Sequence, residues 1–442
     1  MADTAPNVAV IGAGITGITT AYELVLRGAN VTVFERNPYP AIETSYANGA
    51  QVSVCNSEVW NSWANVAKGI SWMLTPGAPL LVSPWPTWQK MSWMAEFVAA
   101  IGRHDAGTIH TVRLALASRA RLLEIAQAEH IAFDHVTRGI LNVYETPADY
   151  RAAEQTGKLL AAGGLERQSM SGAEIHALEP ALNGTFHGGF YTASDFTGDI
   201  HAFTIGLAAA CERRGARLSV STDVRKIEPS PTGVVVSHRV AGSQTGLGSA
   251  SELERTRFDS VVICAGTGSR ALAASLGDRV NIYPVKGYSI TVPLNEQASR
   301  DAAPWVSILD DKAKIVSSRL GEGRLRIAGT AELSGANLDI RASRIAPLVA
   351  WCRKRYPGVS TRNAVPWAGL RPMMPDMLPV VRAGSARGVY YNTGHGHLGW
   401  TLAAATAETV AALVTGIDRR EALTATDTTS APDSAAVKRV AA

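Results

Sequence analysis

Three glycines near the start of the chain stand at a spacing that suits binding of a dinucleotide. Gly12, Gly14 and Gly17 form GxGxxG within the segment VAVIGAGITG. The first glycine allows a tight turn, the second lets a pyrophosphate approach the backbone, and the third lets a helix pack closely on a strand. Glu35 stands where a carboxylate can accept hydrogen bonds from ribose hydroxyls. The acidic Glu35 argues against NADP, whose extra phosphate it would repel, although Arg36 beside it weakens that argument. The motif alone does not distinguish FAD from NAD.

The elements around these glycines are those that the motif requires. Val8 to Ile11 is an apolar run typical of a strand buried on both faces, and Val31 to Phe34 is a second one. Apolar residues recur at helical spacing from Ile15 onward, and Gly28 stands where a helix ends. We therefore predict a compact βαβ unit, with the helix N-terminus facing the phosphates.

The rest of the chain alternates between helix-like and strand-like segments, so we predict an α/β protein of two interleaved domains. Residues 1–90, 195–275 and 359–424 are placed in the nucleotide-binding domain. Residues 91–194 and 276–358 are placed in a second, α+β domain, because Ile282 to Glu332 reads as alternating strands of a largely antiparallel sheet. Residues 425–442 are small and polar and are expected to form a disordered tail.

Composition excludes several classes of function. The formal net charge is +4 and no long basic run occurs, so nucleic-acid binding has no support. The four cysteines are scattered without metal-binding spacing, so we expect no metal site and a reducing compartment. No signal-peptide pattern or spanning stretch of about 20 apolar residues is expected, because the best candidate, Leu402 to Val414, is short and contains Glu408. These features predict a cytoplasmic protein.

Further segments resemble the glycine oxidase and D-amino acid oxidase group of flavoproteins, and within it most closely the D-amino acid dehydrogenase (small subunit) family. The resemblance runs in the family's order from the first strand to about residue 415. It rests on ETSYANGAQVS at 43–53, FDSVVICAG ending at Gly266, YPVKGYSITVP at 283–293, WAGLRPMMPDMLPVV at 367–381 and YNTGHGHLGWT at 391–401. It implies a Rossmann-like FAD-binding domain, an inserted substrate domain and the oxidative deamination of D-amino acids to 2-oxo acids and ammonia.

The resemblance also implies FAD as the cofactor, and the lack of a cysteine in a flavin-attachment context predicts that it is not covalently bound. The glycines of YNTGHGHLGWT let backbone approach a planar ligand, and the helix that follows points its positive end at the flavin. The residues expected to contact FAD are Gly12, Ala13, Gly14, Ile15, Thr16, Gly17, Glu35, Arg36, Ser45, Asn48, Gln51, Val224, Ala265, Gly266, Gly394, His395, Gly396, Leu398 and Gly399.

Arg371 is the residue expected to bind the substrate. Its GLRP context resembles the carboxylate-binding arginine of glycine oxidase, and a guanidinium pairs bidentately with a carboxylate. A structural salt bridge is the alternative, and Asp376 could serve as its partner. Tyr288 and Tyr46 are candidates for the pocket walls, with core packing as the alternative for each. His395 is included as a candidate, although hydride loss from a neutral amine needs no protein base.

Two positions depart from the family pattern. The family usually has glycine where this chain has Met377, and another where it has Arg382. The substitutions leave open the local backbone and the shape of the pocket. Lys286 in the KGY segment and His397 in the glycine turn are noted without an assigned mechanism.

Six of the ten tryptophans lie between residues 58 and 95, where they could pack under a loop, line a channel or dip into a lipid interface; we favour packing. Some similar proteins pass electrons to membrane quinones, so a quinone or other acceptor and peripheral contact with the inner face of the membrane are expectations. An oxidase of glycine, sarcosine, hydroxyproline or another secondary amine, and a flavin subunit that needs a partner subunit, are the alternatives.

Overall fold

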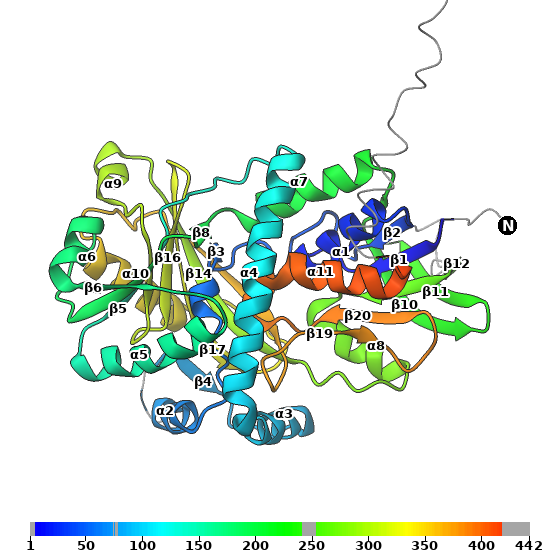
Figure 1. The fold of residues 1–442 in the computed structure, drawn as a ribbon, viewed down its shortest axis with the longest axis horizontal. Helices are drawn as coiled ribbons and strands as arrows, with labels where there is room; N and C mark the ends of the chain where they lie inside the picture. The colour runs from blue at the N-terminus through cyan, green and yellow to red at the C-terminus, as the bar shows by residue number, and fades with distance from the viewer. Residues whose placement is uncertain (1–4, 74, 76–77, 241–252, 418–442) are drawn as a thin grey trace, which may run out of the picture.

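The computed structural model describes residues 5–73, 75, 78–240 and 253–417 of the chain. Two sheets lie side by side along the long axis of the molecule, and the long helix α4 (His104–Ala128) runs across the junction between them (Figure 1). The predicted tail at 425–442 lies outside the described residues.

The first sheet holds the predicted βαβ unit. In the described residues it has six strands, in the order β19 (Val380–Ala383), β20 (Val389–Thr393), β13 (Ser260–Ile263), β1 (Asn7–Ile11), β2 (Asn30–Phe34) and β9 (Arg217–Ser219). All neighbouring pairs are parallel except β19 with β20. The central strand β1 is buried after its first residue, which explains its continuous apolar run.

Different layers cover the two faces of this sheet. Val8 and Val10 of β1 pack against residues of α1 (Ile15–Leu26), α7 (Ile200–Arg213) and α11 (Gly399–Thr415). Ala9 and Ile11 point the other way, toward α8 (Ser269–Ser275) and a small antiparallel sheet of β10 (Thr222–Ser230), β11 (Gly233–Val240) and β12 (Glu254–Phe258). The carboxyl ends of the parallel strands, where α/β proteins bind their ligands, face the second sheet.

The second sheet has nine strands in the described residues and is mainly antiparallel. Its order is β18 (Val365–Met373), β14 (Tyr283–Pro293), β17 (Arg324–Leu333), β16 (Ile315–Leu320), β15 (Ser307–Asp310), β5 (Ile140–Tyr144), β7 (Gly188–Thr192) and β6 (Gln168–Ser171), with β4 (Leu80–Val82) beside β17. The predicted antiparallel block is present, but β5 joins β15 and β4 joins β17 in parallel. α10 (Ala342–Arg355) packs on one face through Leu348, Trp351 and Cys352.

The sheets divide the chain differently from the predicted domain boundaries at three places. β4 and β18 belong to the nine-stranded sheet, although residues 1–90 and 359–424 were placed in the nucleotide-binding domain. α4 was placed in the substrate domain, but its Leu122 and Ile125 pack in the core of the six-stranded sheet. Strand pairing and helix packing over long sequence separations decide these memberships, and local patterns do not report them.

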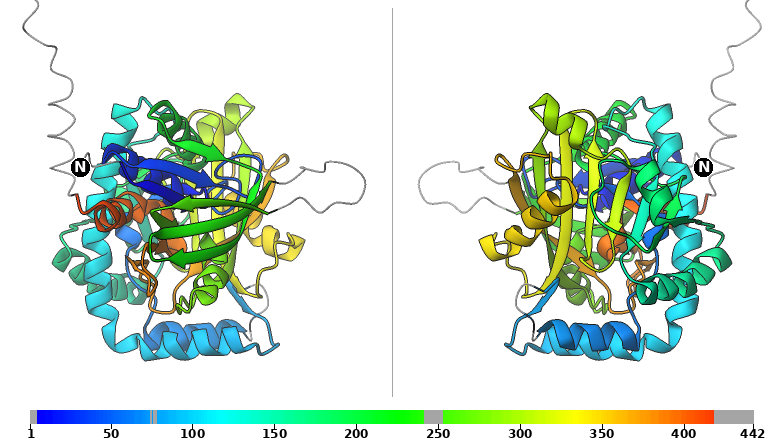
Figure 2. Two further views of the ribbon diagram at one scale, coloured as in Figure 1. Left: turned by 90° about the vertical axis from the view of Figure 1, so that its right-hand side faces the viewer. Right: turned by 90° about the vertical axis from the view of Figure 1, so that its left-hand side faces the viewer.

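The remaining elements are short or peripheral. α2 (Trp63–Met73) and α3 (Trp88–Ala99) lie side by side along one edge of the molecule, as Figure 2 shows. α5 (Pro147–Ala162), α6 (Gly172–Leu178) and α9 (Gln297–Ala302) flank the nine-stranded sheet. The others are the strand pair β3 (Gln51–Val52) and β8 (Phe196–Thr197), and the 3₁₀ turns Val54–Asn56, Ile101–Arg103, Gly266–Gly268 and Gly396–Leu398.

One helical stretch in the described part of the chain, Gly396–Thr415, has the length and mean hydropathy (1.3) of a membrane span. The expectation that no stretch reaches that length was therefore wrong, because the helix begins earlier than Leu402. However, 61% of its apolar window is buried inside the protein. The helix packs against α1 and α4, which makes it a core helix of the six-stranded sheet.

Candidate functional site

A cavity of about 1200 Å³ lies between the two sheets and extends to α2 and α3. One end is formed by the glycine motif. Gly12 has a φ of +101°, and an added Cβ would lie 2.8 Å from the Cys264 carbonyl oxygen. At Gly17 a Cβ would lie 1.8 Å from the Gly12 carbonyl oxygen, so no side chain fits between α1 and the turn. Gly12 and Gly17 therefore have the steric roles that the motif predicts.

The start of α1 is open to a phosphate. No side chain caps the helix at Gly14, although the Ser45 hydroxyl accepts a hydrogen bond from the Ile15 N–H at 3.0 Å. The other N–H groups of the first turn and the positive end of the helix dipole face the cavity, which Gly14, Ile15 and Thr16 line. Ala13 and Gly17 shape this turn but do not themselves line the cavity.

Glu35 lies at the end of β2, beside the same turn. Its carboxylate accepts hydrogen bonds from the Ala13 N–H at 2.8 Å and from the Asn37 N–H at 2.8 Å, and it is buried. A carboxylate has about four acceptor positions, so it retains capacity for a ribose hydroxyl. Arg36 lines the same end and pairs with Glu43 at the surface.

Val224, Ala265 and Gly266 close the nucleotide end of the cavity from β10 and from the turn after β13. The pairing of β10 with β11 is shifted by a bulge directly after Val224. Gly266 has a φ of +53°, and an added Cβ there would meet no atom within 4 Å. Gly266 is therefore needed for its backbone conformation and not for close packing.

The loop from Ser45 to Gln51 is held against the nine-stranded sheet through its backbone. The carbonyls of Ala47, Asn48 and Gly49 accept hydrogen bonds from Ser289, Arg326 and Ser318, at 2.6, 3.1 and 2.8 Å. The Gln51 amide donates to the Ser307 hydroxyl at 2.7 Å. The loop's cavity-facing surface is consequently rigid, and Ser45, Asn48 and Gln51 all line it.

The second glycine turn, from Gly394 to Gly399, faces this loop across the cavity. Gly394 and Gly396 have φ of +78° and +58°, and added Cβ atoms would lie 2.6 Å from Met374 and 2.7 Å from the Met373 sulfur. α11 begins at Gly399 without a capping side chain. Leu398 does not line the cavity and packs in the core with Val54 and Leu402.

His395 is buried at this turn. Because the Thr406 hydroxyl donates to backbone carbonyls, the hydroxyl accepts the His395 Nε2–H at 2.9 Å. Burial lowers the pKa of His395 to about 3, so the imidazole is neutral at physiological pH. His395 lines the cavity but is held by α11 as a structural hydrogen-bond donor.

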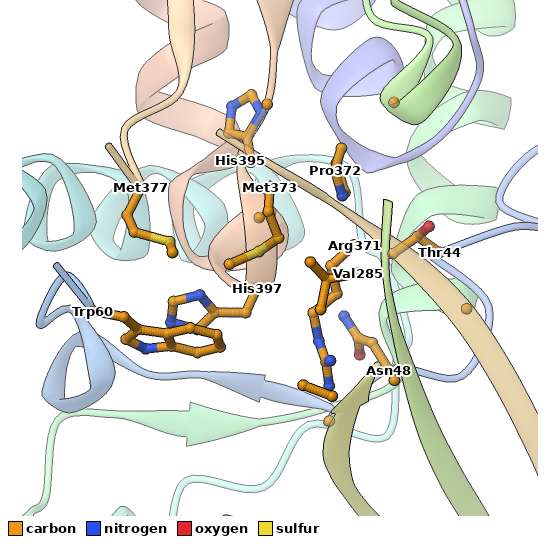
Figure 3. A pocket seen from close by; sticks show the side chains of 18 of the residues that line it. Thr44, Asn48, Trp60, Val285, Arg371, Pro372, Met373, Met377, His395 and His397 are labelled. Carbon is orange, nitrogen blue, oxygen red and sulfur yellow. The ribbon is translucent and has the colours of Figure 1, made fainter. Parts of the chain in front are cut away.

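Arg371 lies on β18 and extends into the cavity, as Figure 3 shows. Its guanidinium crosses Gly287 of β14, where an added Cβ would lie 2.3 Å from Nη2. Nη1 donates to the Thr330 carbonyl at 3.0 Å. The absence of a side chain at position 287 thus leaves the space that the guanidinium occupies.

No carboxylate of the described residues lies within 4 Å of the Arg371 guanidinium. Burial alone lowers the pKa of Arg371 to about 10, which still leaves it charged at neutral pH. Arg371 is partly exposed to the cavity, and a cation that is largely desolvated without a counterion is unfavourable, so a carboxylate ligand would relieve that cost. Asp376, the partner considered from the sequence, instead accepts the Leu378 N–H at 3.2 Å and does not line this cavity.

The two candidate tyrosines do not present their hydroxyls to the cavity. The Tyr288 ring belongs to the core under α10, and its hydroxyl donates to Glu332 at 3.1 Å. Lys286 is buried beside it and pairs with the same carboxylate at 3.2 Å. Tyr46 is 42% exposed, lies edge-on against His201 and does not line the cavity. Tyr288 is thus among the residues that line the cavity, as predicted for a wall residue, although its ring packs in the core, and Tyr46 has a packing role only.

The two departures from the family pattern have different consequences. Met377 has a φ of +64°, a conformation that glycine adopts without strain, so the turn is kept and the side chain is added to the cavity wall. Arg382 lies on the edge strand β19, half exposed and 3.9 Å from Asp278, and does not line the cavity.

Several cavity residues were not identified from the sequence. Trp60 stacks on His397 with ring centroids 4.5 Å apart, and Met373 lies beside them (Figure 3). Thr44 donates to the Leu370 carbonyl at 2.9 Å and ties the loop to β18. Gly287 was within a quoted segment, but its closeness to the Arg371 guanidinium depends on the β14–β18 register, in which it pairs with Gly369 and Val285 pairs with Arg371.

Residues 7–413 match the family of FAD dependent oxidoreductases named DAO. The chain belongs to this family. It is 54% identical over 409 residues to D-amino acid dehydrogenase 3 of Mesorhizobium japonicum, covering 92% of this chain and 97% of that protein. It is 39% identical over 418 residues to the D-amino acid dehydrogenase of Paramagnetospirillum magneticum, covering 93% of this chain and 95% of that protein.

Solved structures of the same fold extend the comparison. Glycine oxidase from Geobacillus kaustophilus aligns with a TM-score of 0.71 and 19% identity, covering 93% of this chain and 96% of that one. L-proline dehydrogenase from P. horikoshii aligns with a TM-score of 0.68 and 16% identity, over 94% of this chain and 95% of that one. At this identity the likeness establishes the fold. The predicted Rossmann-like domain with a sheet-rich second domain is confirmed.

FAD is the cofactor of this family, and the cavity has the features that FAD requires. Gly12, Gly14, Gly394 and Gly396 all line the cavity, so their backbone is open to a ligand there. Two uncapped helix starts, at α1 and α11, offer N–H groups at separate positions along it. A pyrophosphate at one start and a ring system at the other would use both.

Proposed function

We propose that this chain oxidises D-amino acids to imino acids, which water hydrolyses to 2-oxo acids and ammonia. Arg371 carries the proposal, because it places a charged guanidinium without a carboxylate partner inside the FAD-site cavity. A substrate carboxylate supplies that partner. The 54% identical relative named D-amino acid dehydrogenase 3 supports the choice of substrate.

The protein's contribution is to hold and orient the substrate. A bidentate pair between Arg371 and the substrate carboxylate fixes two atoms of the amino acid, and therefore which substituent of Cα points at the ring. Bound FAD supplies the acceptor for the hydride that leaves Cα. Ser45, Asn48 and Gln51 on one side and the 394–399 turn on the other would hold the ring.

Proton chemistry at the site needs no general base from the protein. His395 is neutral and bound to Thr406, and burial followed by the charge of Arg371 lowers the pKa of His397 to about 3. Both imidazoles are thus weak bases at neutral pH. The substrate amine accordingly has to reach the site in its neutral form.

The decisive experiment is anaerobic mixing of the purified protein with D- and L-amino acids, glycine and prolines, followed by flavin absorbance. Bleaching by D-isomers is the expected result. In Arg371→Ala we expect the substrate KM to rise about 100-fold with FAD retained, since a charge-assisted bidentate pair contributes about 2–3 kcal/mol. Arg382→Ala, an arginine outside the cavity, serves as the matched control and should leave KM unchanged.

Other results of these experiments would support one of the alternative functions. An unchanged KM in Arg371→Ala would exclude the arginine as the carboxylate anchor. Bleaching by glycine, sarcosine or hydroxyproline alone, with peroxide formed in air, would indicate an oxidase of those amines. FAD binding without turnover of any amine, restored by a second protein, would indicate a partner-dependent subunit.

For the electron acceptor we propose a quinone that reaches the cavity from a lipid surface. α2, β4 and α3 form one edge of the molecule, and no residue of α2 is buried. Trp85 and Trp88 are 79% and 81% exposed there, and Trp63, Ile70, Met73 and Met91 are also exposed. Tryptophan favours the interface between lipid and water.

The charge of this edge and the shape of the cavity behind it both support its role as the lipid-facing surface. Lys68 and Arg103 are exposed on this edge, and in the described part of residues 60–103 the one acidic side chain, Glu96, pairs with Arg279. The edge is therefore complementary to anionic lipid headgroups. The inner side of α2, β4 and α3 lines the cavity through Trp72, Leu80 and Met94, which supplies an apolar path toward the FAD site.

A further inference from the structure

The cavity wall next to Arg371 is apolar on one side. In Figure 3 Val285 lies beside Arg371, and Met373, Met377 and Trp60 follow on one side of it, while Asn48 lies on the other side. Behind them Phe97, Leu333 and Trp93 continue the same cluster. Once the substrate carboxylate is bound to Arg371, the substrate side chain has this cluster within reach.

Most polar groups around the cluster are already used by the chain, with His397 Nε2 and Asn61 Oδ1 as the exceptions among the described residues. The Trp93 indole N–H donates to the Met373 carbonyl at 2.8 Å. The Asn61 amide donates to the Pro375 and Phe97 carbonyls at 2.8 and 2.9 Å. The wall therefore offers contact area and few hydrogen bonds to a side chain.

Some of the charges that line the cavity are paired within the protein, whereas Lys68 and Arg167 line it without an ion pair among the described residues. Glu58 lies 3.3 Å from the His104 ring, and hydrogen bonding to Glu58 raises the pKa of His104 to about 9. Lys314 pairs with Asp311. The apolar cluster beside Arg371 contains no charged side chain among the described residues, so a second carboxylate or ammonium buried there would lose its hydration without gaining a counterion.

Met377 adds to this wall where the family pattern has glycine. Its backbone keeps a φ of +64°, and its side chain is buried with Met373. Methionine is flexible and polarisable, so it adapts to aromatic and branched side chains. Met377 thus contributes apolar surface to the cavity that holds the carboxylate anchor.

We propose that the preferred substrates are D-amino acids with a large apolar side chain, which packs against Trp60, Met373 and Met377. This inference rests on the proposed function and specifies its substrate class. Small substrates such as D-alanine leave the wall uncovered. Acidic and basic ones such as D-glutamate and D-lysine bury an unpaired charge.

The test is kcat/KM, measured with a soluble dye as acceptor, along D-alanine, D-2-aminobutyrate, D-norvaline and D-norleucine, with D-phenylalanine, D-glutamate and D-lysine added. Each buried methylene is expected to raise kcat/KM about threefold to fourfold. D-norleucine should then exceed D-alanine by more than tenfold. D-glutamate and D-lysine should fall below D-norleucine by at least the same factor.

Two variants test whether these wall residues cause the rise of kcat/KM with the length of the substrate side chain. Trp60→Ala and Met377→Gly should flatten the series, and Met377→Gly is compatible with the backbone because glycine tolerates a positive φ. Trp305→Ala is the matched control, since Trp305 is 38% exposed and lies outside the cavity. Its slope along the series should equal that of the wild type.

The outcomes separate the inference from the function on which it rests. If D-alanine is turned over as well as D-norleucine, or if both cavity variants retain the wild-type slope, the side-chain assignment is wrong while D-amino acid oxidation stands. If no D-amino acid bleaches the flavin, the proposed function itself fails. Should one variant not fold, the wild-type series and the other variant still decide.

Discussion

At the scale of single residues, the site depends on what surrounds a few side chains. Arg371 is a candidate for binding the substrate because no described carboxylate reaches it and because Gly287, which has no side chain, leaves space for its guanidinium. Tyr288 and Arg371 lie on neighbouring strands, yet Tyr288 points into the core and bonds Glu332. Residue type alone made both plausible, and the direction of each side chain separates them.

His395 should make the stability of the protein depend on pH. Its pKa is lowered by burial to about 3 from a usual value near 6.5. Below pH 6.5 the unfolded chain therefore binds a proton that the folded protein does not. The full contribution of His395 to the free energy of unfolding is therefore present above pH 6.5. It is lost as the pH falls, by up to about 1.4 kcal/mol per pH unit.

We expect His395→Gln to weaken this dependence in urea unfolding between pH 6.5 and 4.5, measured at saturating FAD. His110→Gln, a change at an exposed histidine of α4, should retain the wild-type slope. Equal slopes in wild type and His395→Gln would show that the buried imidazole is not responsible.

At the scale of elements, the two faces of β14 have different roles, because one borders the cavity and the other packs in the core. Val285, Gly287 and Ser289 line the cavity or hold the 45–51 loop, whereas Lys286 and Ile290 are buried on the opposite face. α2 has no buried residue, and α2 and α3 carry exposed tryptophan and methionine side chains on their outer sides. Such exposure of tryptophan and methionine is unusual for a surface that contacts water alone.

The α2–β4–α3 edge should bind anionic lipid vesicles. We expect the wild-type protein to sediment with vesicles of phosphatidylglycerol and phosphatidylcholine, less at high salt. Trp85→Ser combined with Trp88→Ser should weaken binding by tenfold or more, because each indole buries a large apolar area in the interface. Quinone reduction in vesicles should fall with it, while turnover with a soluble dye serves as the internal reference.

Leu338→Ser is the matched control, because Leu338 is 56% exposed on another part of the surface. Vesicle binding that is unchanged in the double tryptophan variant, or reduced equally by Leu338→Ser, would show that this edge is not the lipid-binding surface.

At the scale of the whole molecule, the cavity is formed where two sheets meet. The glycine motif and Glu35 come from the six-stranded sheet, and Arg371 comes from the nine-stranded sheet. The 45–51 loop is hydrogen-bonded to both, through Ile15 on one side and Ser289, Ser318 and Arg326 on the other. A cofactor bound along the cavity therefore contacts both halves.

FAD should stabilise the protein as a whole. We expect the apoprotein to melt at a lower temperature and the midpoint to rise with added FAD, since a ligand at 100 times its Kd contributes about 2.7 kcal/mol. Gly17→Ala should lose this rise, because a Cβ there would lie 1.8 Å from the Gly12 carbonyl oxygen. Gly102→Ala, with no atom within 4 Å of the added Cβ, should keep it.

An FAD-dependent rise in Gly17→Ala equal to that of the wild type would exclude the proposed role of the turn. A Gly17→Ala apoprotein that melts with the wild-type apoprotein, but no longer responds to FAD, would place the effect in cofactor binding and not in folding.

Much of the fold and of the nucleotide end follows from local sequence. A buried strand, a glycine turn and an amphipathic helix are specified by neighbouring residues, so β1, α1 and β2 and the steric roles of Gly12 and Gly17 could be predicted. Glycine turns can also be recognised from the sequence, because few other residues tolerate their backbone conformation. Met377 is the exception, and its departure from the family pattern was visible before its φ was known.

The tertiary structure alone decided which residues share the cavity. Arg371 meets Gly287 through the register of β14 with β18, and Trp60 meets His397 across more than 300 residues of chain. It also decided that β4 and β18 complete the nine-stranded sheet and that the tryptophan-rich segment divides between cavity wall and exposed edge. Strand pairing and side-chain direction depend on contacts distant in sequence, whereas propensity and periodicity are local.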